Sequence, residues 1–270
     1  MNTALTIAGS DSSGGAGIQA DIKTMTMNGV YAMSAITSLT AQNTLGVTGI
    51  FNVTPEFLEQ ELDAIFSDIR PDAVKIGMVS EASLIRVIGG KLQQYGAGHI
   101  VLDPVMIATS GARLVSAAAL EAAEKLLLPM ATVITPNLPE AEMLLGREAD
   151  ESAAADALRA AELARELHER YGCAVLVKGG HGAGRTAVDV LFDGDTLREY
   201  ALERIEHPVS AHGTGCSLAA AITAELAAGK TLADAVQGAK DYVHGAIANS
   251  YWVGEGCGVL GLPQHIPERG

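Results

Sequence analysis

Residues 9–17 read Gly-Ser-Asp-Ser-Ser-Gly-Gly-Ala-Gly. They join a short apolar run at residues 4–8 to a helical pattern that carries Ile18, Ile22 and Met25 on one face. A buried strand, a glycine-rich loop and a helix in this order are typical of α/β proteins, which bind ligands at the carboxyl ends of their strands. Because small residues let the backbone approach a ligand closely, we predict that this loop binds substrate.

The same loop allows two other interpretations. Gly15, Gly17 and Ala20 fit a dinucleotide fingerprint, which also requires an acidic residue about 20 positions later to hold the ribose. No Asp or Glu occurs between Ile22 and Pro55, so nicotinamide binding is the weaker interpretation. A plain loop-to-helix turn without a ligand is the other alternative that the residues leave open.

The strand and helix pattern continues along the chain. Further runs resemble buried parallel strands, at residues 73–76, 100–102, 132–134 and 174–177. Apolar residues recur at helical spacing at residues 54–69, 116–128, 151–171 and 215–228. Alternation of this kind needs right-handed crossovers, so we predict an α/β fold with a mostly parallel central sheet and helices on both faces.

The helix at residues 54–69 has a clear start signal. Thr54 can cap it, and Pro55 occupies the first helical position. The apolar residues that follow at helical spacing predict its buried face: Leu58, Leu62, Ile65 and Ile69.

Two segments break the alternation. Residues 31–53 contain Gly46 and Gly49, and residues 186–200 contain an Asp193-Gly194 turn signal between apolar runs. Both are predicted to be β-hairpins or additions at the sheet edge, which gives a small β edge or lid element. Neither a low-complexity linker nor an internal repeat occurs, so we predict one domain over residues 1–270.

Composition and charge exclude several classes of protein. Of the 270 residues, 48% are hydrophobic and 19% are charged, which allows a substantial core and excludes wholesale disorder. The net charge of −14 would repel nucleic acids and anionic membranes. The sequence shows neither a signal peptide nor the roughly 20 apolar residues of a membrane span. Cys173, Cys216 and Cys257 are odd in number and widely spaced, so we expect a cytoplasmic protein without disulfides or a zinc site.

A second glycine motif reads His212-Gly213-Thr214-Gly215-Cys216-Ser217 and precedes an alanine-rich helical pattern. Glycines ahead of a helix leave backbone N–H groups free, and the helix dipole attracts phosphate to them. The motif lacks the lysine of a Walker A loop and the flanking glycines of a nucleophile elbow. It indicates either an anion hole or a glycine-capped helix with a buried cysteine.

Other polar residues stand at predicted strand ends. Asp103, Asn137 and Glu140 could hold Mg²⁺ through water, as phosphoryl transfer requires. The alternative is that Asn137 and Glu140 only cap a helix. Lys178 stands beside two glycines, where it can reach an anion or can simply be a solvated strand end.

Seven motifs occur together in one order over nearly the whole chain. They are Ala-Gly-Ser-Asp with Ser-Gly-Gly-Ala-Gly-Ile-Gln-Ala-Asp at residues 8–21, Ala-Gln-Asn-Thr at 41–44, Lys-Ile-Gly-Met at 75–78, Leu-Asp-Pro-Val-Met at 102–106, Thr-Pro-Asn-Leu-Pro-Glu-Ala at 135–141, Lys-Gly-Gly-His at 178–181 and His-Gly-Thr-Gly-Cys at 212–216. In this combination they resemble the bacterial hydroxymethylpyrimidine/phosphomethylpyrimidine kinases of thiamine biosynthesis. The resemblance implies a ribokinase-like fold, a homodimer, and ATP-dependent phosphorylation of 4-amino-5-hydroxymethyl-2-methylpyrimidine and then of its monophosphate.

The resemblance also implies roles for individual residues. For the pyrimidine, Gln42 would donate and accept hydrogen bonds, and the pocket would be lined by Gly9, Asp21, Met78 and Val105. For ATP and the metal, the implied residues are Lys178, Asn137 and Thr214 at the nucleotide and Asp103 and Glu140 at Mg²⁺. The anion hole would comprise Gly213, Thr214, Gly215 and Cys216, with Cys216 as the base where most ribokinase-like enzymes carry Asp. A helix N-terminus can lower the pKa of a cysteine toward neutrality, although nearby phosphates oppose this.

Two rival functions accompany this resemblance. Pyridoxal kinases of the cysteine-bearing branch are also similar from end to end. They tend to carry a cysteine where this chain has Ile107, Ala108 and Thr109, and to lack the Ala-Gln-Asn of residues 41–43. A non-catalytic pyrimidine sensor would have lost part of the anion hole or the carboxylates, all of which are present. Pockets for two small aromatic alcohols differ by few hydrogen bonds, so side activity on pyridoxal stays open.

Overall fold

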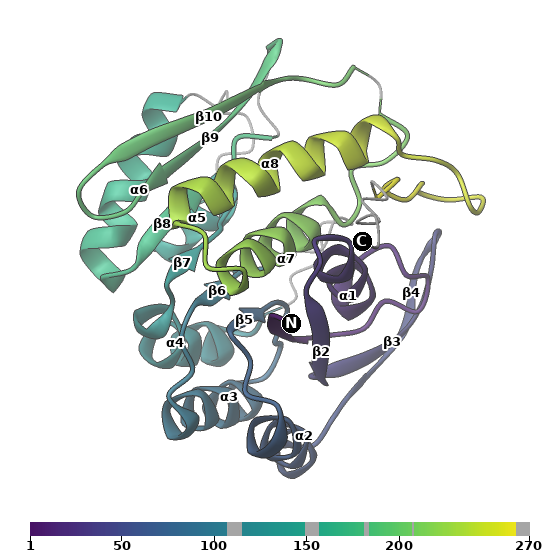
Figure 1. Ribbon diagram of the computed structural model, residues 1–270, viewed down its shortest axis with the longest axis vertical. Coiled ribbons are helices and arrows are strands. Elements are labelled where there is room, and N and C mark those ends of the chain that lie inside the picture. Colours follow the sequence, from purple (N-terminus) through teal and green to yellow (C-terminus); the bar gives the residue numbers. More distant parts are fainter. Residues whose placement is uncertain (107–114, 149–156, 181–183, 207, 263–270) are drawn as a thin grey trace.

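The computed structural model describes residues 1–106, 115–148, 157–180, 184–206 and 208–262, and an eight-stranded sheet runs through them (Figure 1). Its strands are β1 (Thr3–Ala8), β2 (Tyr31–Ile36), β5 (Ala73–Ile76), β6 (Ile100–Leu102), β7 (Val133–Ile134), β8 (Ala174–Val177), β9 (Thr186–Phe192) and β10 (Leu197–Glu203). Their order is β10-β9-β8-β7-β6-β5-β1-β2. The six neighbouring strands β8, β7, β6, β5, β1 and β2 are parallel to one another. β9 is antiparallel to β8, and β10 is antiparallel to β9. The predicted α/β class with a mostly parallel sheet is confirmed.

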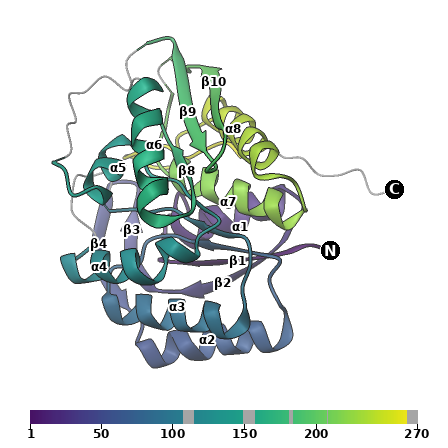
Figure 2. The same cartoon turned by 90° about the vertical axis from the view of Figure 1, so that its left-hand side faces the viewer.

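The helices form a layer on each face of the sheet (Figure 2). One layer contains α2 (Pro55–Asp68), α3 (Ala82–Tyr95), α4 (Ala117–Leu126), the short 3₁₀ helix η1 (Leu128–Met130), α5 (Leu138–Leu144) and α6 (Ala157–Tyr171). The other layer contains α1 (Gly17–Met27), α7 (Thr214–Ala227) and α8 (Leu232–Ala248). In the part of the chain that the structure describes, no helix has both the length and the apolar character needed to cross a membrane.

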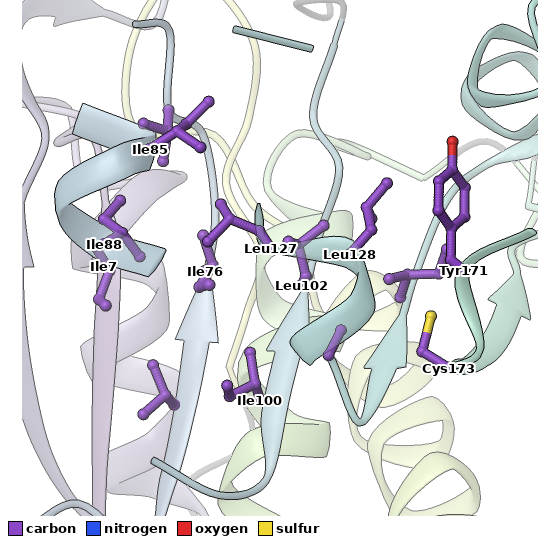
Figure 3. Close-up of a cluster of buried hydrophobic side chains, with 14 of the residues drawn as sticks. Ile7, Ile76, Ile85, Ile88, Ile100, Leu102, Leu127, Leu128, Tyr171 and Cys173 are labelled. Carbon is purple, nitrogen blue, oxygen red and sulfur yellow. The ribbon is translucent and has the colours of Figure 1, made fainter. Parts of the chain in front are cut away.

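Each face of the sheet is buried against its own helix layer because side chains alternate along a strand. Ile7, Ile76 and Leu102 point into the layer that contains α3 and η1, where Ile85 and Leu127 pack against the strands (Figure 3). Alternate positions of the same strands contact α1, α7 and α8. The two polar residues Thr6 and Lys75 therefore face the second layer, although both are fully buried.

Helix α2 begins as the sequence predicts. The Thr54 hydroxyl accepts a hydrogen bond of 3.2 Å from the Phe57 N–H, and Pro55 is the first helical residue. Its fully buried residues are Leu58 and Leu62, with Phe66 nearly so. The prediction that Ile69 completes this face is wrong, because the helix ends at Asp68 and leaves Ile69 exposed.

Residues 31–53 divide between two sheets. β2 pairs in parallel with β1 as an edge strand of the main sheet, and β3 (Ser38–Asn43) and β4 (Gly46–Asn52) form a separate antiparallel hairpin. Residues 186–200 form the predicted hairpin of β9 and β10. The helix predicted from residue 151 is described only from Ala157, and residues 107–109 and His181 also lie outside the described residues. Helices α3 and α8 were not predicted.

Candidate active site

The loops that follow the parallel strands meet at one edge of the sheet. Gly9 comes directly after β1, Asp103 directly after β6 and Lys178 directly after β8. Asn137, which follows β7, forms a parallel bridge with Lys178, so these loops stay paired beyond the strand ends. The carboxyl ends of parallel strands thus bring together residues that are far apart in the sequence.

Lys178 and Asp103 form the central ion pair of this edge. Lys178 Nζ lies 2.9 Å from Asp103 Oδ1 and 4.0 Å from Glu140 Oε2, and Thr135 donates a 3.0 Å hydrogen bond to the same Oδ1 atom. Burial opposes the charge on Asp103, but Lys178 and Lys75 outweigh it and lower the pKa of this carboxyl group. Burial likewise opposes the charge on Lys178, whose pKa Asp103 and Glu140 raise. Both groups are therefore charged at neutral pH.

Asn137 and Glu140 form a capping box at the start of α5. Asn137 Oδ1 accepts a 2.8 Å hydrogen bond from the Glu140 N–H, and Glu140 Oε2 accepts one of 2.8 Å from the Asn137 N–H. Burial raises the pKa of Glu140, and Lys178 opposes this rise. The capping interpretation therefore holds for both residues, and Glu140 in addition faces Lys178.

A metal ion would find two carboxylates at this edge. Asp103 and Glu140 both approach Lys178, and Asp103 Oδ2 accepts no hydrogen bond from the described part of the chain. The described residues contain no group of three Asp, Glu, His or Cys side chains that could hold a metal. Mg²⁺ is commonly bound by one or two carboxylates together with water and phosphate oxygens, and this pair fits that mode of binding.

Helix α7 begins against the same ion pair. Gly213 caps it with a φ of 83°, in the left-handed region that favours glycine, and a Cβ atom there would lie 2.0 Å from Gly15 O. A Cβ atom on Gly215 would lie 3.4 Å from Lys178 Nζ and 3.5 Å from Asp103 Oδ2. Because the first N–H groups of a helix lack helical partners, the start of α7 offers donors for an anion beside Lys178.

Cys216 lies half-buried in the first turn of α7. Burial raises the pKa of its thiol, Lys75 opposes this, and Asp21 and Asp103 add to it. The net direction is opposite to the lowering expected from the helix N-terminus, because desolvation and the carboxylates outweigh Lys75 and the hydrogen bond from the Gly17 N–H. The thiol is therefore protonated at neutral pH in the ligand-free protein.

Asp21 lies below the loops in a second, closed ion pair. Lys75 Nζ is 2.8 Å from Asp21 Oδ1 and 2.7 Å from Oδ2, and Thr6 donates a 2.6 Å hydrogen bond to Oδ2. Burial opposes the charge on Lys75, but Asp21 raises its pKa. The family resemblance places Asp21 at the pyrimidine pocket, whereas the structure commits both of its oxygens to protein groups. Lys75 had no predicted role, although a lysine inside a buried strand was the signal for one.

Gly9, Met78 and Ser38 lie together at the end of β1. A Cβ atom on Gly9 would lie 2.6 Å from Ser38 Oγ and 2.9 Å from Met78 Cε, so only glycine fits. Val105 lies further along the same edge, and its N–H donates to Asp103 O at 2.8 Å. Behind Val105 is a mostly apolar cavity of about 50 Å³ whose lining includes Val79, Ile85, Leu120 and Leu144.

Gln42 lies at an irregularity of the β3–β4 hairpin. The pairing of β3 with β4 shifts register between Ala41 and Gln42, and a bulge of this kind re-aims a side chain. The Gln42 N–H donates to Ser12 Oγ at 2.8 Å, and the Ser12 hydroxyl donates to Gln42 O at 2.5 Å. Its side-chain amide makes no hydrogen bond to the described part of the chain, so its donor and acceptor are available.

Comparisons with known proteins agree with one another. Residues 11–261 match the phosphomethylpyrimidine kinase family. A hydroxymethylpyrimidine/phosphomethylpyrimidine kinase from Rhizobium meliloti is 49% identical over 257 residues, which cover 94% of each chain. The crystal structure of a phosphomethylpyrimidine kinase from Clostridium difficile has a TM-score of 0.80 at 41% identity and covers 92% of this chain and 100% of that one. An ADP complex of Bacillus subtilis pyridoxal kinase has a TM-score of 0.86 at 35% identity and covers 96% of both chains.

Proposed function

The chain belongs to the phosphomethylpyrimidine kinase family, and we propose that it transfers the γ-phosphoryl group of ATP to 4-amino-5-hydroxymethyl-2-methylpyrimidine and then to the resulting monophosphate. The observation that carries this proposal is the position of the Lys178–Asp103 pair beside Gly215 at the start of α7. A cation, a carboxylate and free helix amides at one point are what the transfer of a phosphoryl group requires.

Lys178 and the amides of α7 supply the positive field for ATP. The chain carries a net charge of −14, so its overall electrostatic field repels a nucleotide and local donors have to hold the phosphates. Lys178 is charged and stands where the phosphates would meet the helix dipole. Thr214, in the first turn, donates its hydroxyl to Ala211 O at 2.9 Å and its backbone N–H to the same oxygen at 3.4 Å, so the N–H groups of Gly215 and Cys216 are the better donors for the anion hole.

Asp103 and Glu140 are the residues that would hold Mg²⁺. When bound there, the ion would neutralise charge on the phosphate oxygens during transfer. Asp103 is the better ligand of the two, because its Oδ2 atom accepts no bond from the described residues, whereas Glu140 Oε2 is used in the capping box. Asn137 keeps its side-chain oxygen on the cap, so its contact with ATP would have to come from the amide nitrogen.

Gln42 is the residue that would identify the pyrimidine. An amide both donates and accepts, which matches the adjacent amino group and ring nitrogen of a 4-aminopyrimidine. Neither function of the Gln42 amide is used within the described part of the chain. Gly9 and Met78 lie near the strand end where the ring would sit, and Gln42 is tied to the glycine loop through Ser12.

A coupled ADP-release assay tests this function, with the pyrimidine alcohol and pyridoxal measured side by side. We expect kcat/KM to be higher for the pyrimidine by about tenfold or more, because Gln42 pairs only with its amino-pyrimidine edge. In Gln42→Leu, calorimetry should show about tenfold weaker pyrimidine binding, since a buried polar edge loses its partner. Binding of ATP to the same variant is the control and should not change.

Each opposite result points to a named rival. Faster turnover of pyridoxal would assign the chain to pyridoxal phosphorylation. The similarity to the Bacillus subtilis pyridoxal kinase is the reason for testing this rival. Ligand binding without release of ADP from either alcohol would make the protein a sensor. Tight binding of the pyrimidine by Gln42→Leu would remove Gln42 from the site.

We also propose that the chain acts as a homodimer and as one domain over residues 1–270 in the cytoplasm. Support for the dimer comes from exposed large apolar side chains on and beside the hairpin of β3 and β4 and in the segment that precedes Gly254, which approaches Thr44: Leu39, Leu45, Val47, Ile50, Phe51, Tyr251 and Trp252. A monomer in sedimentation equilibrium would contradict the dimer, and two separate unfolding transitions would contradict the single domain. Recovery of the protein from another cell fraction would contradict the cytoplasmic location.

A further inference from the structure

The carboxylate of Asp11 joins two loops that the family resemblance does not connect. Its Oδ1 atom accepts hydrogen bonds from Ser13 N at 2.9 Å and Ser13 Oγ at 2.7 Å. Its Oδ2 atom accepts from Gly15 N at 3.1 Å and Ala16 N at 2.8 Å. His212 Nε2 approaches the same Oδ2 atom at 3.3 Å and donates to it in the tautomer that carries hydrogen on Nε2.

The two loops touch through backbone atoms at this junction. A Cβ atom on Gly213 would lie 2.0 Å from Gly15 O, and one on Gly15 would lie 2.9 Å from His212 Cδ2. The Asp11–His212 bond links the two loops, the Gly17 N–H bonds the Cys216 thiol beside it, and the helices α1 and α7 that follow the loops pack together. Asp11 is almost completely buried, which protects the bond from competition with water.

Each loop carries one of the two reactants under the proposed function. The loop of residues 9–17 contains Gly9 and, through Ser12, holds the backbone of Gln42 on the pyrimidine side. His212 leads directly into the anion hole at the start of α7. The junction therefore lies between the acceptor alcohol and the phosphoryl group that it attacks.

We propose that Asp11 and His212 are positioning residues, which fix the distance between the bound alcohol and the bound phosphoryl group. The inference rests on the proposed function. It follows from the sensitivity of transfer reactions to alignment, in which a displacement of about 1 Å can cost roughly 10²-fold in rate. The pair touches neither reactant, so its loss affects turnover more than the binding of either ligand.

The charge state of Asp11 supports this role. Burial opposes its ionisation, but the hydrogen bonds from His212 and Ser13 outweigh burial and lower its pKa to about 2. Asp11 is therefore a carboxylate at neutral pH, and the junction needs only a donor from residue 212.

The test compares His212→Gln with His212→Met. The two replacements have similar volume and flexibility, but only glutamine has an N–H group that can donate to Asp11. We expect His212→Met to lower kcat for the first phosphorylation by about 10- to 100-fold, with the Kd of the pyrimidine and of ATP each changed by less than about threefold. His212→Gln should keep kcat within about fivefold of the parent.

A double substitution checks that the two residues act together. Asp11→Asn combined with His212→Met should be no slower than the slower of the two single variants, because one bond cannot be removed twice. The control for folding is His168→Met, which removes a hydrogen bond of 2.7 Å to Cys173 O at the other end of β8. It should lower the melting temperature and leave kcat of the folded enzyme unchanged.

Several results would overturn the inference. They are a kcat of His212→Met equal to the parent, a kcat of His212→Gln as low as that of His212→Met, multiplicative losses in the double variant, and an equal loss of kcat in His168→Met. Failure of the proposed function is distinguishable, because the parent protein itself would then release no ADP with the pyrimidine alcohol.

Discussion

The Lys75–Asp21 and Lys178–Asp103 pairs have the same chemistry but different surroundings. In the first pair both carboxylate oxygens accept from Lys75, Thr6 adds a further bond, and both side chains are 0% exposed. In the second pair Lys178 bonds Oδ1 alone, and 15% of the Lys178 side chain is exposed. Both oxygens of Asp21 are bonded within the closed pair, whereas Asp103 Oδ2 accepts no bond from the described residues and the Lys178 side chain is partly exposed.

This difference separates a pair that holds the fold from a pair that can exchange partners. Lys75 projects from the middle of β5 into the helix layer and meets α1, so the pair joins a strand to a helix. Lys178 and Asp103 project from strand ends into the edge where ligands bind. Position along the strand, rather than residue type, therefore distinguishes the pair inside the fold from the pair that we propose to act on ATP.

The largest expected difference between the two pairs follows from replacing the lysine of each pair by methionine. Lys75→Met leaves Asp21 buried and unpaired, and we expect the free energy of unfolding to fall by about 3–5 kcal/mol. Lys178→Met should cost clearly less stability, because the buried Asp103 keeps the hydrogen bond from Thr135 and the electrostatic stabilisation by Lys75. It should instead lower kcat by about 10²- to 10³-fold, since a preorganised cation for the phosphates is gone.

Urea unfolding at neutral pH and steady-state kinetics measure the two effects. Lys75→Met combined with Asp21→Leu serves as the control, because replacing a whole buried ion pair by apolar groups is often neutral. Lys178→Met should also weaken ATP binding far more than pyrimidine binding. Equal losses of stability in the two methionine variants would contradict the distinction between a closed and an open pair.

The sequence predicted local elements well and long-range pairings poorly. The bounds of β5, β6 and β8 match the predicted runs, and Thr54 caps α2 as expected. Helix α3 was missed because Glu81 gives it no side-chain cap and Gly89-Gly90 interrupts its interior. The place of β2 beside β1 depends on parallel pairing, which no local turn signal records.

The site shows the same division. Motifs placed Asp103 and Lys178 at strand ends and Glu140 at the start of a helix, and the structure brings all three together. The bonding of Asp21 to Lys75 joins residues 54 positions apart and depends on which face of β5 meets α1, so spacing could not reveal it. The raised pKa of Cys216 was missed for a related reason, since its causes lie on other elements.

Charged groups of both pairs shift the pKa of the Cys216 thiol. The pH dependence of the two phosphorylation rates therefore tests the role of Cys216. Burial raises the pKa of its thiol above the ordinary value of about 8.5, so at neutral pH the thiolate fraction is small. If the thiolate accepts the proton of the alcohol, the rate of the first phosphorylation should rise about tenfold per pH unit until the pH exceeds that pKa. The second step uses a monophosphate with a second pKa of about 6, so its rate should be nearly flat.

Single-turnover rates from the alcohol and from the monophosphate, between about pH 6.5 and 9, measure this difference. Cys216→Ala should remove the slope of the first step and lower its rate by about 10²-fold or more at the top of the range, while sparing the second step. Equal slowing of both steps would limit Cys216 to the geometry of the anion hole. An unchanged slope would show that another group accepts the proton.

Thr6 and Thr135 each donate a hydroxyl hydrogen bond to one of the two carboxylates, so replacing them gives the smallest expected difference between the two pairs. The bonds are 2.6 Å to Asp21 and 3.0 Å to Asp103, and valine keeps the shape of threonine without the donor. Thr6→Val should cost about 1.5–3 kcal/mol of unfolding free energy, because its partner is a buried charge that water cannot reach. It should leave the kinetic constants of the folded enzyme unchanged, since Lys75 still holds both oxygens of Asp21.

Thr135→Val should show the reverse balance. Asp103 is also buried, but it retains the ion pair with Lys178 and the electrostatic stabilisation by Lys75, so we expect a loss of only about 1 kcal/mol in stability. Without the Thr135 hydrogen bond, only Lys178 orients the Asp103 carboxylate. We therefore expect KM for ATP to rise by about 3- to 10-fold. Urea unfolding and ATP kinetics on both valine variants decide the matter. A rise of KM for ATP in Thr6→Val but not in Thr135→Val would mean that the closed pair, and not the open one, serves the nucleotide.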